Sequence, residues 1–252
     1  MIGKGLFMNL TDIQLEADTH THTILSGHAW STLDENCRDG AAAGVRAICM
    51  TDHGPAMDGG MVWFAPNSFG ALPETIHGVQ VVPGVEFNII DRHGTLDITQ
   101  KSILKHVRFG IASMHDITMP QLNKAMHTDA YIAALQNPVV DILGHPGNAH
   151  FENDPLPIVL EAKRLNKLIE INNGSFKSRR GSRDICLDFA KLCMEHDVQV
   201  CVSSDAHHSS QIGKFPAALE MLQEISFPYE LICNRTLESF YAYMKSAHPD
   251  CY

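Results

Sequence analysis

The alternation of short apolar runs with helical patterns constrains the fold of this chain more than any other feature of its sequence. Seven β-rich runs occur along the 252 residues, and most of them lack a regular polar–apolar alternation. Such runs are typical of parallel strands that are covered on both faces. The predicted strands are residues 14–19, 47–51, 79–85, 109–114, 139–144, 168–172 and 199–204.

Helical patterns separate these strands. The first predicted helix, residues 34–43, follows a capping-box spacing from Thr32 to Glu35 and stops before Gly44. The other predicted helices are residues 120–136, 156–166, 182–196, 215–224 and 236–246. Strands that alternate with helices predict βαβ units, parallel pairing and right-handed crossovers.

Seven such units predict an α/β fold, a distorted (β/α)7 TIM-like barrel that forms a single domain. We expect the domain to span residues 16–252, after an N-terminal extension of residues 1–15. Residues 54–74 are long and irregular in pattern, so we expect them to form a loop over the mouth of the barrel.

Composition excludes several other classes of protein. A chain with 44% apolar and 19% charged residues can bury a core. No run approaches the roughly 20 apolar residues of a membrane span, and residues 1–15 lack the pattern of a signal peptide, so we expect a cytoplasmic protein. The net charge of −10 disfavours a nucleic-acid-binding surface. Seven scattered cysteines without a Cys-x-x-Cys pair indicate neither a disulfide framework nor a thiolate zinc site.

Fifteen histidines are present, and many of them lie where predicted strands end. The carboxyl ends of barrel strands converge on one face, where active sites are built. The metal-binding residue types at these ends are His20, His22, His53, Glu86, His115, His145, Asp205 and His207, and His28 lies in the loop after the first strand. The other eight histidines, His150 and His208 among them, are interpreted as ordinary polar residues.

The spacing of these residues favours shared ions. Residues i and i+2 point to the same side of a strand, so His20 with His22, and Asp205 with His207, can each reach one ion together. A His/Glu/Asp set without cysteine suits hydrolytic zinc, manganese or iron.

Four short motifs occur in order along the chain at these strand ends. They are Asp18-Thr19-His20-Thr21-His22, Thr51-Asp52-His53, Gly144-His145-Pro146 and Ser204-Asp205-Ala206-His207. On these motifs the chain resembles the PHP (polymerase and histidinol phosphatase) family from about residue 16 onward. Further stretches, such as His53-Gly54-Pro55 and Glu170-Ile171-Asn172-Asn173, resemble the YcdX-type phosphatases of that family.

The resemblance implies a trinuclear centre of three divalent metal ions, usually zinc, with manganese or iron in some members. It assigns to the first ion His20, His22, Glu86 and Asp205. It assigns to the second ion a bridging Glu86 with His115 and His145, and to the third ion His28, His53 and His207.

The implied activity is that of a phosphatase, which hydrolyses small phosphate monoesters through a metal-bridging hydroxide. Asp205 is the candidate for handling the proton of the water, and Asp52 is the candidate for orienting a ligand from behind. A basic run, Lys177, Arg179, Arg180 and Arg183, follows the sixth strand. Arg179 and Arg180 are candidates for binding phosphate, and the alternative is an exposed charged turn.

Three alternatives remain open at this point. A histidinol-phosphate phosphatase would use the same chemistry on one metabolite, and a PHP exonuclease would cut nucleic acid, which the acidic charge disfavours. A non-catalytic binding or structural domain would retain the fold, although the complete set of ligand types counts against it. The expected partner is a small phosphorylated substrate, without a membrane, and self-association into a homo-oligomer is compatible with the sequence.

Overall fold

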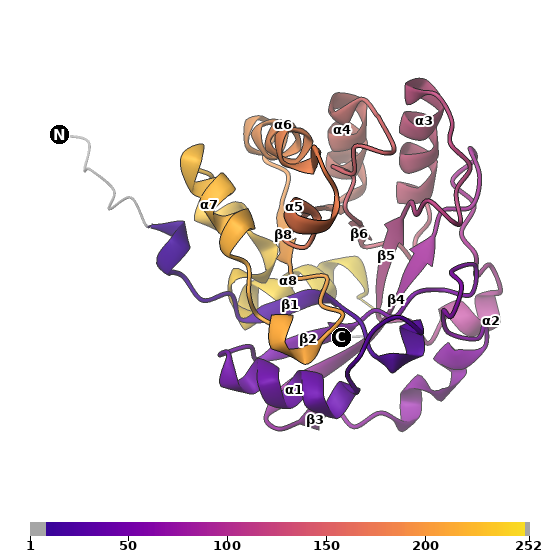
Figure 1. Ribbon diagram of the computed structural model, residues 1–252, viewed down its shortest axis with the longest axis vertical. Coiled ribbons are helices and arrows are strands. Elements are labelled where there is room, and N and C mark those ends of the chain that lie inside the picture. Colours follow the sequence, from indigo (N-terminus) through magenta and orange to yellow (C-terminus); the bar gives the residue numbers. More distant parts are fainter. Residues whose placement is uncertain (1–8, 250–252) are drawn as a thin grey trace.

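Parallel strands form the centre of the computed structural model, which describes residues 9–249. Their order in the sheet is β1 (Ala17–Thr21), β2 (Ala47–Met50), β4 (Val79–Asn88), β5 (Phe109–Ser113), β6 (Ile142–Leu143), β7 (Leu168–Asn172) and β8 (Val200–Ser203) (Figure 1). A two-residue strand, β3 (Thr75–Ile76), pairs antiparallel with β4 outside this order.

The first and last strands meet, so the sheet curls into a nearly closed barrel. Thr21 and Ala206 form a parallel bridge, and the His22 amide donates to the Ala206 carbonyl oxygen at 2.9 Å. The strand residues are buried on both faces, for instance along all of β7, as expected when helices cover a parallel sheet. The predicted single-domain α/β barrel of seven parallel strands is confirmed.

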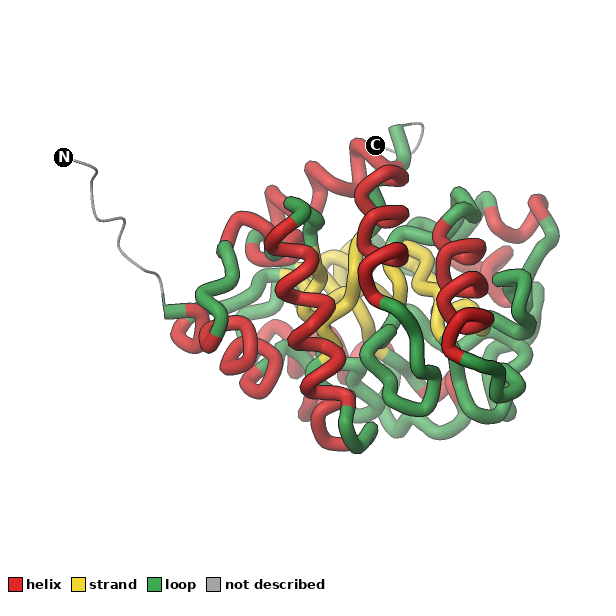
Figure 2. Tube along the Cα trace, turned by 90° about the horizontal axis from the view of Figure 1, so that it is seen from above, coloured by secondary structure: helices red, strands yellow, loops and turns green. Residues whose placement is uncertain are grey.

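Helices surround the strands, as seen from above in Figure 2. They are α1 (Leu33–Ala42), α2 (Lys101–Leu104), α3 (Lys124–Leu135), α4 (Pro155–Leu165), α5 (Ser175–Ser178), α6 (Ser182–Glu195), α7 (Pro216–Glu224) and α8 (Leu237–Ala247). Both halves of the predicted capping box between Thr32 and Glu35 are present at the start of α1. Helix α4 begins with Pro155 after Asp154, whose side chain accepts from the Leu156 amide, an arrangement favoured at helix N-termini.

Three strands differ from the prediction in a way that matters for the site. Strand β1 covers Ala17–Thr21 rather than residues 14–19, so it contains His20 instead of ending before it. Strand β4 continues past residue 85 to Asn88, because residues 84–88 pair in register with β5, and it therefore contains Glu86 rather than ending before it. Strand β6 is shorter than predicted because the Val140 amide donates to the Asn137 carbonyl oxygen in a turn. Such non-local pairing cannot be inferred from a strand's own sequence.

The segment at residues 54–74 is only partly irregular. It contains a 3-10 helix, Ala65–Ala71, with Pro66 near its start, so the expectation of an irregular loop is wrong for these seven residues. Proline is tolerated there because its missing N–H would be unpaired in the first turn. Phe69, Leu72 and Glu74 line a cavity beside the start of β4, so the expectation of a loop over the mouth is wrong for this end of the segment.

Residues 9–15 pack against the barrel, where Leu10 and Leu15 are buried in the main core. The Leu10 amide donates to Gln223 Oε1 of α7 at 2.6 Å. Residues 1–8 of the predicted extension lie outside the described residues. Among residues 9–249, the helices are all too short or too polar to cross a bilayer.

Candidate metal centre

Glu86 lies at the centre of the cluster that the strand ends form. Strand β4 places its carboxylate inside the barrel mouth, where the side chain is fully buried. One oxygen, Oε2, lies 2.6 Å from His53 Nδ1, 3.3 Å from His20 Nε2 and 3.5 Å from His22 Nε2. The other, Oε1, lies 3.1 Å from His145 Nε2 and 3.3 Å from His115 Nε2. Five of the predicted ligands thus surround one carboxylate.

Asp205 connects this cluster to the remaining predicted ligands. Its Oδ1 lies 3.2 Å from His22 Nε2 and 3.6 Å from His207 Nδ1. The Nε2 atoms of His207 and His28 are 3.0 Å apart, and His28 is exposed at the rim. The structure therefore brings all nine predicted ligands into one continuous cluster.

Two of these residues have a strained backbone. His145 has φ of 29° and Asp205 has φ of 54°, a region that residues other than glycine rarely occupy. Such conformations cost on the order of 1–3 kcal/mol each and occur preferentially at functional sites. The fold thus holds both side chains in the mouth at a cost in stability.

Glu170 fixes two of the ligands from behind. It is buried in β7, its Oε1 lies 2.7 Å from His20 Nδ1, and its Oε2 accepts from the His145 amide at 2.5 Å. A carboxylate on the far nitrogen of a ligating histidine sets its tautomer and orientation. Glu170 has no role among the predictions from the sequence, although a carboxylate inside an apolar strand is a signal for one.

Asp52 positions a third predicted ligand, His22, which is the kind of role proposed for it from the sequence. Its Oδ1 accepts from Ser26 Oγ at 2.6 Å, and Ser26 Oγ lies 3.0 Å from His22 Nδ1. The Ser26 hydroxyl proton is used for Asp52, so its oxygen accepts the Nδ1 proton of His22. Asp52 therefore orients His22 through the side chain of Ser26. The ligand that it orients is thus not His53, its neighbour in the sequence.

A metal ion fits this arrangement because buried acceptors face one another. With Nδ1 of His22 protonated, its Nε2 carries a lone pair, and that lone pair faces Asp205 and Glu86 oxygens. Six buried atoms of the cluster lack any hydrogen-bond partner: Nε2 of His20, His22 and His115, Nδ1 of His53 and His145, and Oε2 of Glu86. Buried unpartnered polar atoms are costly, and cations bound among them would remove that cost for all but His145 Nδ1, since His145 faces Glu86 with its other ring nitrogen.

The pKa shifts of the clustered histidines also indicate that the site favours a bound cation. Burial lowers the pKa of His20, but the carboxylates of Glu170, Glu86 and Asp205 outweigh it and raise that pKa well above its usual range. For His22, burial together with His53 and His207 holds the pKa well below its usual range. A proton can therefore supply the charge at His20 but not at His22, where divalent ions bound by neutral imidazoles can.

Three sets of ligand atoms lie close enough to hold an ion. They are His20 with His22 and Glu86, His53 with Glu86 and His115, and His22 with His53 and His207. The first set matches part of the grouping that the family resemblance implies for the first ion. The other two place His53 and His22 where the resemblance places His145 and His28. The assignment of ligands to individual ions stays a prediction.

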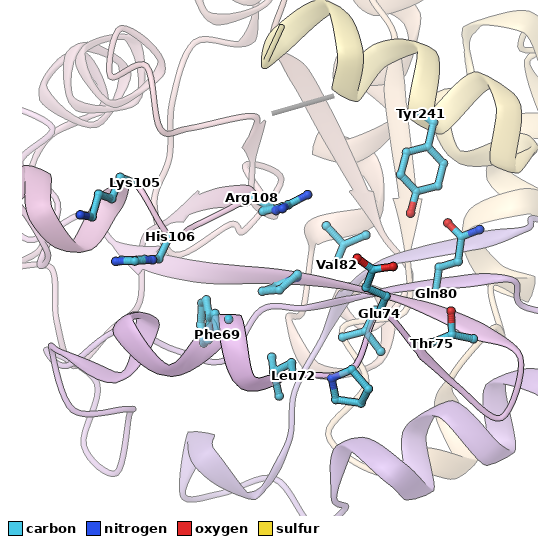
Figure 3. Close-up of a pocket in the computed structure, with 14 residues that line it drawn as sticks. Phe69, Leu72, Glu74, Thr75, Gln80, Val82, Lys105, His106, Arg108 and Tyr241 are labelled. Atoms are coloured by element: carbon cyan, nitrogen blue, oxygen red, sulfur yellow. The ribbon is translucent and has the colours of Figure 1, made fainter. Parts of the chain in front are cut away.

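A cleft of about 560 Å³ opens beside the cluster. It is lined by Met57, His115, Asp116, Ile117, Asn148, Ala149, His150, Ser178, Arg179 and Arg180. His150, interpreted from the sequence as an ordinary polar residue, thus lines this cleft. A second cavity, of about 600 Å³, lies at the opposite end of the barrel, beside the start of β4. Figure 3 shows Tyr241 of α8 pointing there toward Gln80 of β4.

The four basic residues after β7 have different environments. Arg179 Nη1 donates to Ser175 Oγ at 2.9 Å and to Asp205 Oδ2 at 3.3 Å, so it links the cleft to the cluster. Arg180 is exposed and lines the cleft. Arg183 instead forms an exposed ion pair with Glu224, 2.5 Å long, and Lys177 is exposed.

Comparisons with known proteins agree with this architecture. The model of the PHP domain family matches residues 18–181. A "probable phosphatase" of Clostridium botulinum (strain Langeland) is 45% identical over 232 residues, which cover 91% of this chain and 94% of that protein. Another "probable phosphatase", from Acetivibrio thermocellus, is 41% identical over 228 residues, covering 90% of this chain and 94% of that protein.

Solved structures show the same fold at low sequence identity. A histidinol phosphate phosphatase of Lactococcus lactis, complexed with zinc, L-histidinol and phosphate, has a TM-score of 0.56 and 16% identity. The match covers 84% of this chain and 92% of that one. A putative histidinol phosphatase of Listeria monocytogenes gives a TM-score of 0.57 at 14% identity, covering 79% and 97% of the two chains.

Proposed function

The chain belongs to the PHP domain family, and on that premise we propose that it is a metal-dependent phosphatase that hydrolyses small phosphate monoesters. The single observation that carries this proposal is the set of six buried, unpartnered nitrogen and oxygen atoms around Glu86, at the mouth where barrel enzymes build their active sites. The names of the relatives, probable phosphatases, support the reaction class.

We further propose three divalent ions, zinc or, as alternatives, manganese or iron. His20, His22, His28, His53, Glu86, His115, His145, Asp205 and His207 would hold them. His and carboxylate ligands accept all three metals, so availability in the cell decides among them. Bound there, the ions would lower the pKa of a water and neutralise charge on the phosphoryl oxygens.

Asp205 and Arg179 act on the substrate side of the cluster. Asp205 Oδ2 already accepts from Arg179 and from Asn172 Nδ2, at 3.3 and 3.1 Å, so that oxygen is directed away from the cluster while Oδ1 faces it. Burial raises the pKa of Asp205, but His20, His22 and Arg179 outweigh this and hold it well below its usual range. Asp205 is thus ionised beside the cluster, and it is the group that we propose to handle the proton of the attacking water.

Arg179 would bind a phosphoryl oxygen in the cleft, and Arg180 would supply further positive charge at its entrance. A guanidinium offers several donors in a fixed plane and suits phosphate well. The cleft volume of about 560 Å³ is in the range of small-molecule sites. These features favour a small phosphorylated substrate.

The test is hydrolysis of p-nitrophenyl phosphate by the purified protein before and after chelation, with bis-p-nitrophenyl phosphate as the diester control. We expect turnover of the monoester that a chelator removes and that zinc or manganese restores, with slower turnover of the diester. Faster cleavage of the diester would instead favour a nuclease. Metal-loaded protein without activity on either ester would contradict the proposal.

A further inference from the structure

Asp97 lies behind the cluster and is not one of its predicted ligands. It follows Leu96, which forms an antiparallel bridge with Ile89, so the chain after β4 turns back along the end of that strand. The carboxylate accepts three hydrogen bonds there: Oδ1 from the Asn88 amide at 3.1 Å, and Oδ2 from Asn88 Nδ2 at 2.6 Å and from the Ala56 amide at 3.0 Å.

These bonds determine which way the Asn88 side chain faces. Asn88 is fully buried, and its Nδ2 also donates to the Gly54 carbonyl oxygen at 3.3 Å. With both amide protons directed at acceptors, the amide oxygen faces the other side, where it lies 2.8 Å from His115 Nδ1. An amide oxygen can only accept, so the proton of His115 lies on Nδ1 and its Nε2 is free to bind a metal.

Asp97 also sets the position of the loop that follows His53. Besides accepting from the Ala56 amide, its carboxylate fills the space beside Gly54, where an added Cβ would lie 2.3 Å from Oδ2. Only glycine leaves that room. This loop continues to Met57, which lines the substrate cleft together with His115.

We propose that Asp97 is a positioning residue that acts through Asn88 to fix the tautomer and ring orientation of His115, and that it couples this ligand to the loop at residues 54–57. The inference rests on the proposed function in one respect, namely that His115 binds a metal ion. Its geometric content, the chain of hydrogen bonds from Asp97 through Asn88 to His115, can be measured in the metal-free protein.

The test compares Asp97→Asn with Asp91→Asn. Asp91 lies in the same returning segment and also accepts backbone hydrogen bonds, from the amides of His93 and Thr95, but its Oδ1 accepts both, which an asparagine oxygen can replace. At position 97 both oxygens accept from N–H groups, so an asparagine must turn its NH2 group toward another donor. Both variants therefore lose one negative charge, but only Asp97→Asn disturbs the chain of hydrogen bonds to Asn88 and His115.

The first readout is zinc affinity by competition with a chelator, and the second is the tautomer of His115 from 15N NMR of the metal-free protein. We expect Asp97→Asn to weaken binding by about 10- to 100-fold, the usual cost of losing such an outer partner, and to mix the two tautomers. Asp91→Asn should match the wild type in both readouts. In a His115→Gln background, Asp97→Asn should cause no further loss of affinity, because the two residues act in one chain.

Wild-type affinity and a wild-type tautomer in Asp97→Asn would overturn the inference, as would equal losses in the Asp91 control. Should Asp97→Asn fail to fold, Asn88→Ala must mix the His115 tautomers, and an unchanged tautomer there overturns the relay. Failure of the wild type to bind metal would contradict the proposed function instead, while the tautomer measurement, which needs no metal, would still decide the inference.

Discussion

The two ends of the barrel both bury carboxylates next to histidines, but only the mouth leaves a group of these buried atoms without hydrogen-bond partners among residues 9–249. At the amino ends of the strands, Asp141 accepts from the Gly110 amide at 2.9 Å and from His248 Nε2 at 2.7 Å. Asn234 is likewise fully engaged, since it accepts from the Val202 amide and donates to the carbonyl oxygens of Ala17 and Val202. These contacts satisfy the polar groups of the base within the protein.

At the carboxyl ends the same residue types crowd together, and several of their buried atoms have no hydrogen-bond partner. The cluster around Glu86 contributes six of the twelve buried, unpartnered side-chain atoms found among residues 9–249. The cavity at the base, although slightly larger than the cleft at the mouth, adjoins no such set. Unmet hydrogen-bonding capacity, rather than cavity size or residue type, therefore distinguishes the proposed functional end of this molecule.

The largest expected effect is at the mouth, from Glu86→Gln. The substitution preserves shape but removes the charge that five histidines surround, so we expect kcat/KM to fall by about a thousandfold or more. The measurement is steady-state hydrolysis of p-nitrophenyl phosphate, with circular dichroism to check the fold. Wild-type turnover in a folded variant would show that catalysis does not need the Glu86 carboxylate.

The next effect concerns the arginines beside the cleft. Arg179→Ala removes the group that contacts Asp205, and we expect kcat/KM to fall by about a hundredfold, as for the loss of one donor to a developing anion. Arg180→Ala should mainly raise KM. The matched control is Arg183→Ala, which breaks only the exposed pair with Glu224 and should leave kinetics unchanged. Equal kinetics in all three variants would indicate that these arginines lie in an exposed charged turn without a role in catalysis.

Removal of the metal ions by a chelator should lower the stability of the protein, because the ions are proposed to bind at the mouth of the barrel. Ions that bind only the folded protein stabilise it by about 2.7 kcal/mol at a hundredfold excess over Kd. Their removal should therefore lower the Tm by roughly 5–10 °C for a chain of this size. Scanning calorimetry with and without chelator measures this shift. Glu86→Gln should show a much smaller response, and a Tm of the wild type that ignores chelator would contradict the prediction.

The smallest effect is expected at the base, from Asp141→Ala. Loss of the buried acceptor leaves the Gly110 amide and His248 without a partner, at a cost of about 1–3 kcal/mol. We expect a lower Tm with an unchanged kcat and an unchanged response to chelator. If activity fell while stability stayed constant, the two ends would not divide stability and function as described.

The sequence predicted the barrel and the composition of the cluster because both depend on local patterns. Strand β7 has the predicted bounds, residues 168–172, and all the predicted ligands except His28 lie at strand ends because parallel strands of a barrel share one direction. Glu86 was found even though β4 extends past it, since it stays near the strand end although that end lies three residues further on than predicted.

The supporting contacts of the cluster were not predictable in the same way. Asp97 reaches Asn88 only because the chain turns back after β4, and Ser26 links Asp52 to His22 across two loops. The strain at His145 and Asp205 likewise follows from the closed barrel. These features depend on tertiary packing, which periodicity and motif spacing do not encode.

The most direct test of the central claim is the metal content of the purified protein by elemental analysis, with Glu86→Gln and Asp141→Ala measured in parallel. The account predicts two to three divalent ions per chain in the wild type, a similar content in Asp141→Ala, and a clear loss in Glu86→Gln. Fewer than one ion per chain in several wild-type preparations, with no gain after addition of zinc or manganese, would contradict it.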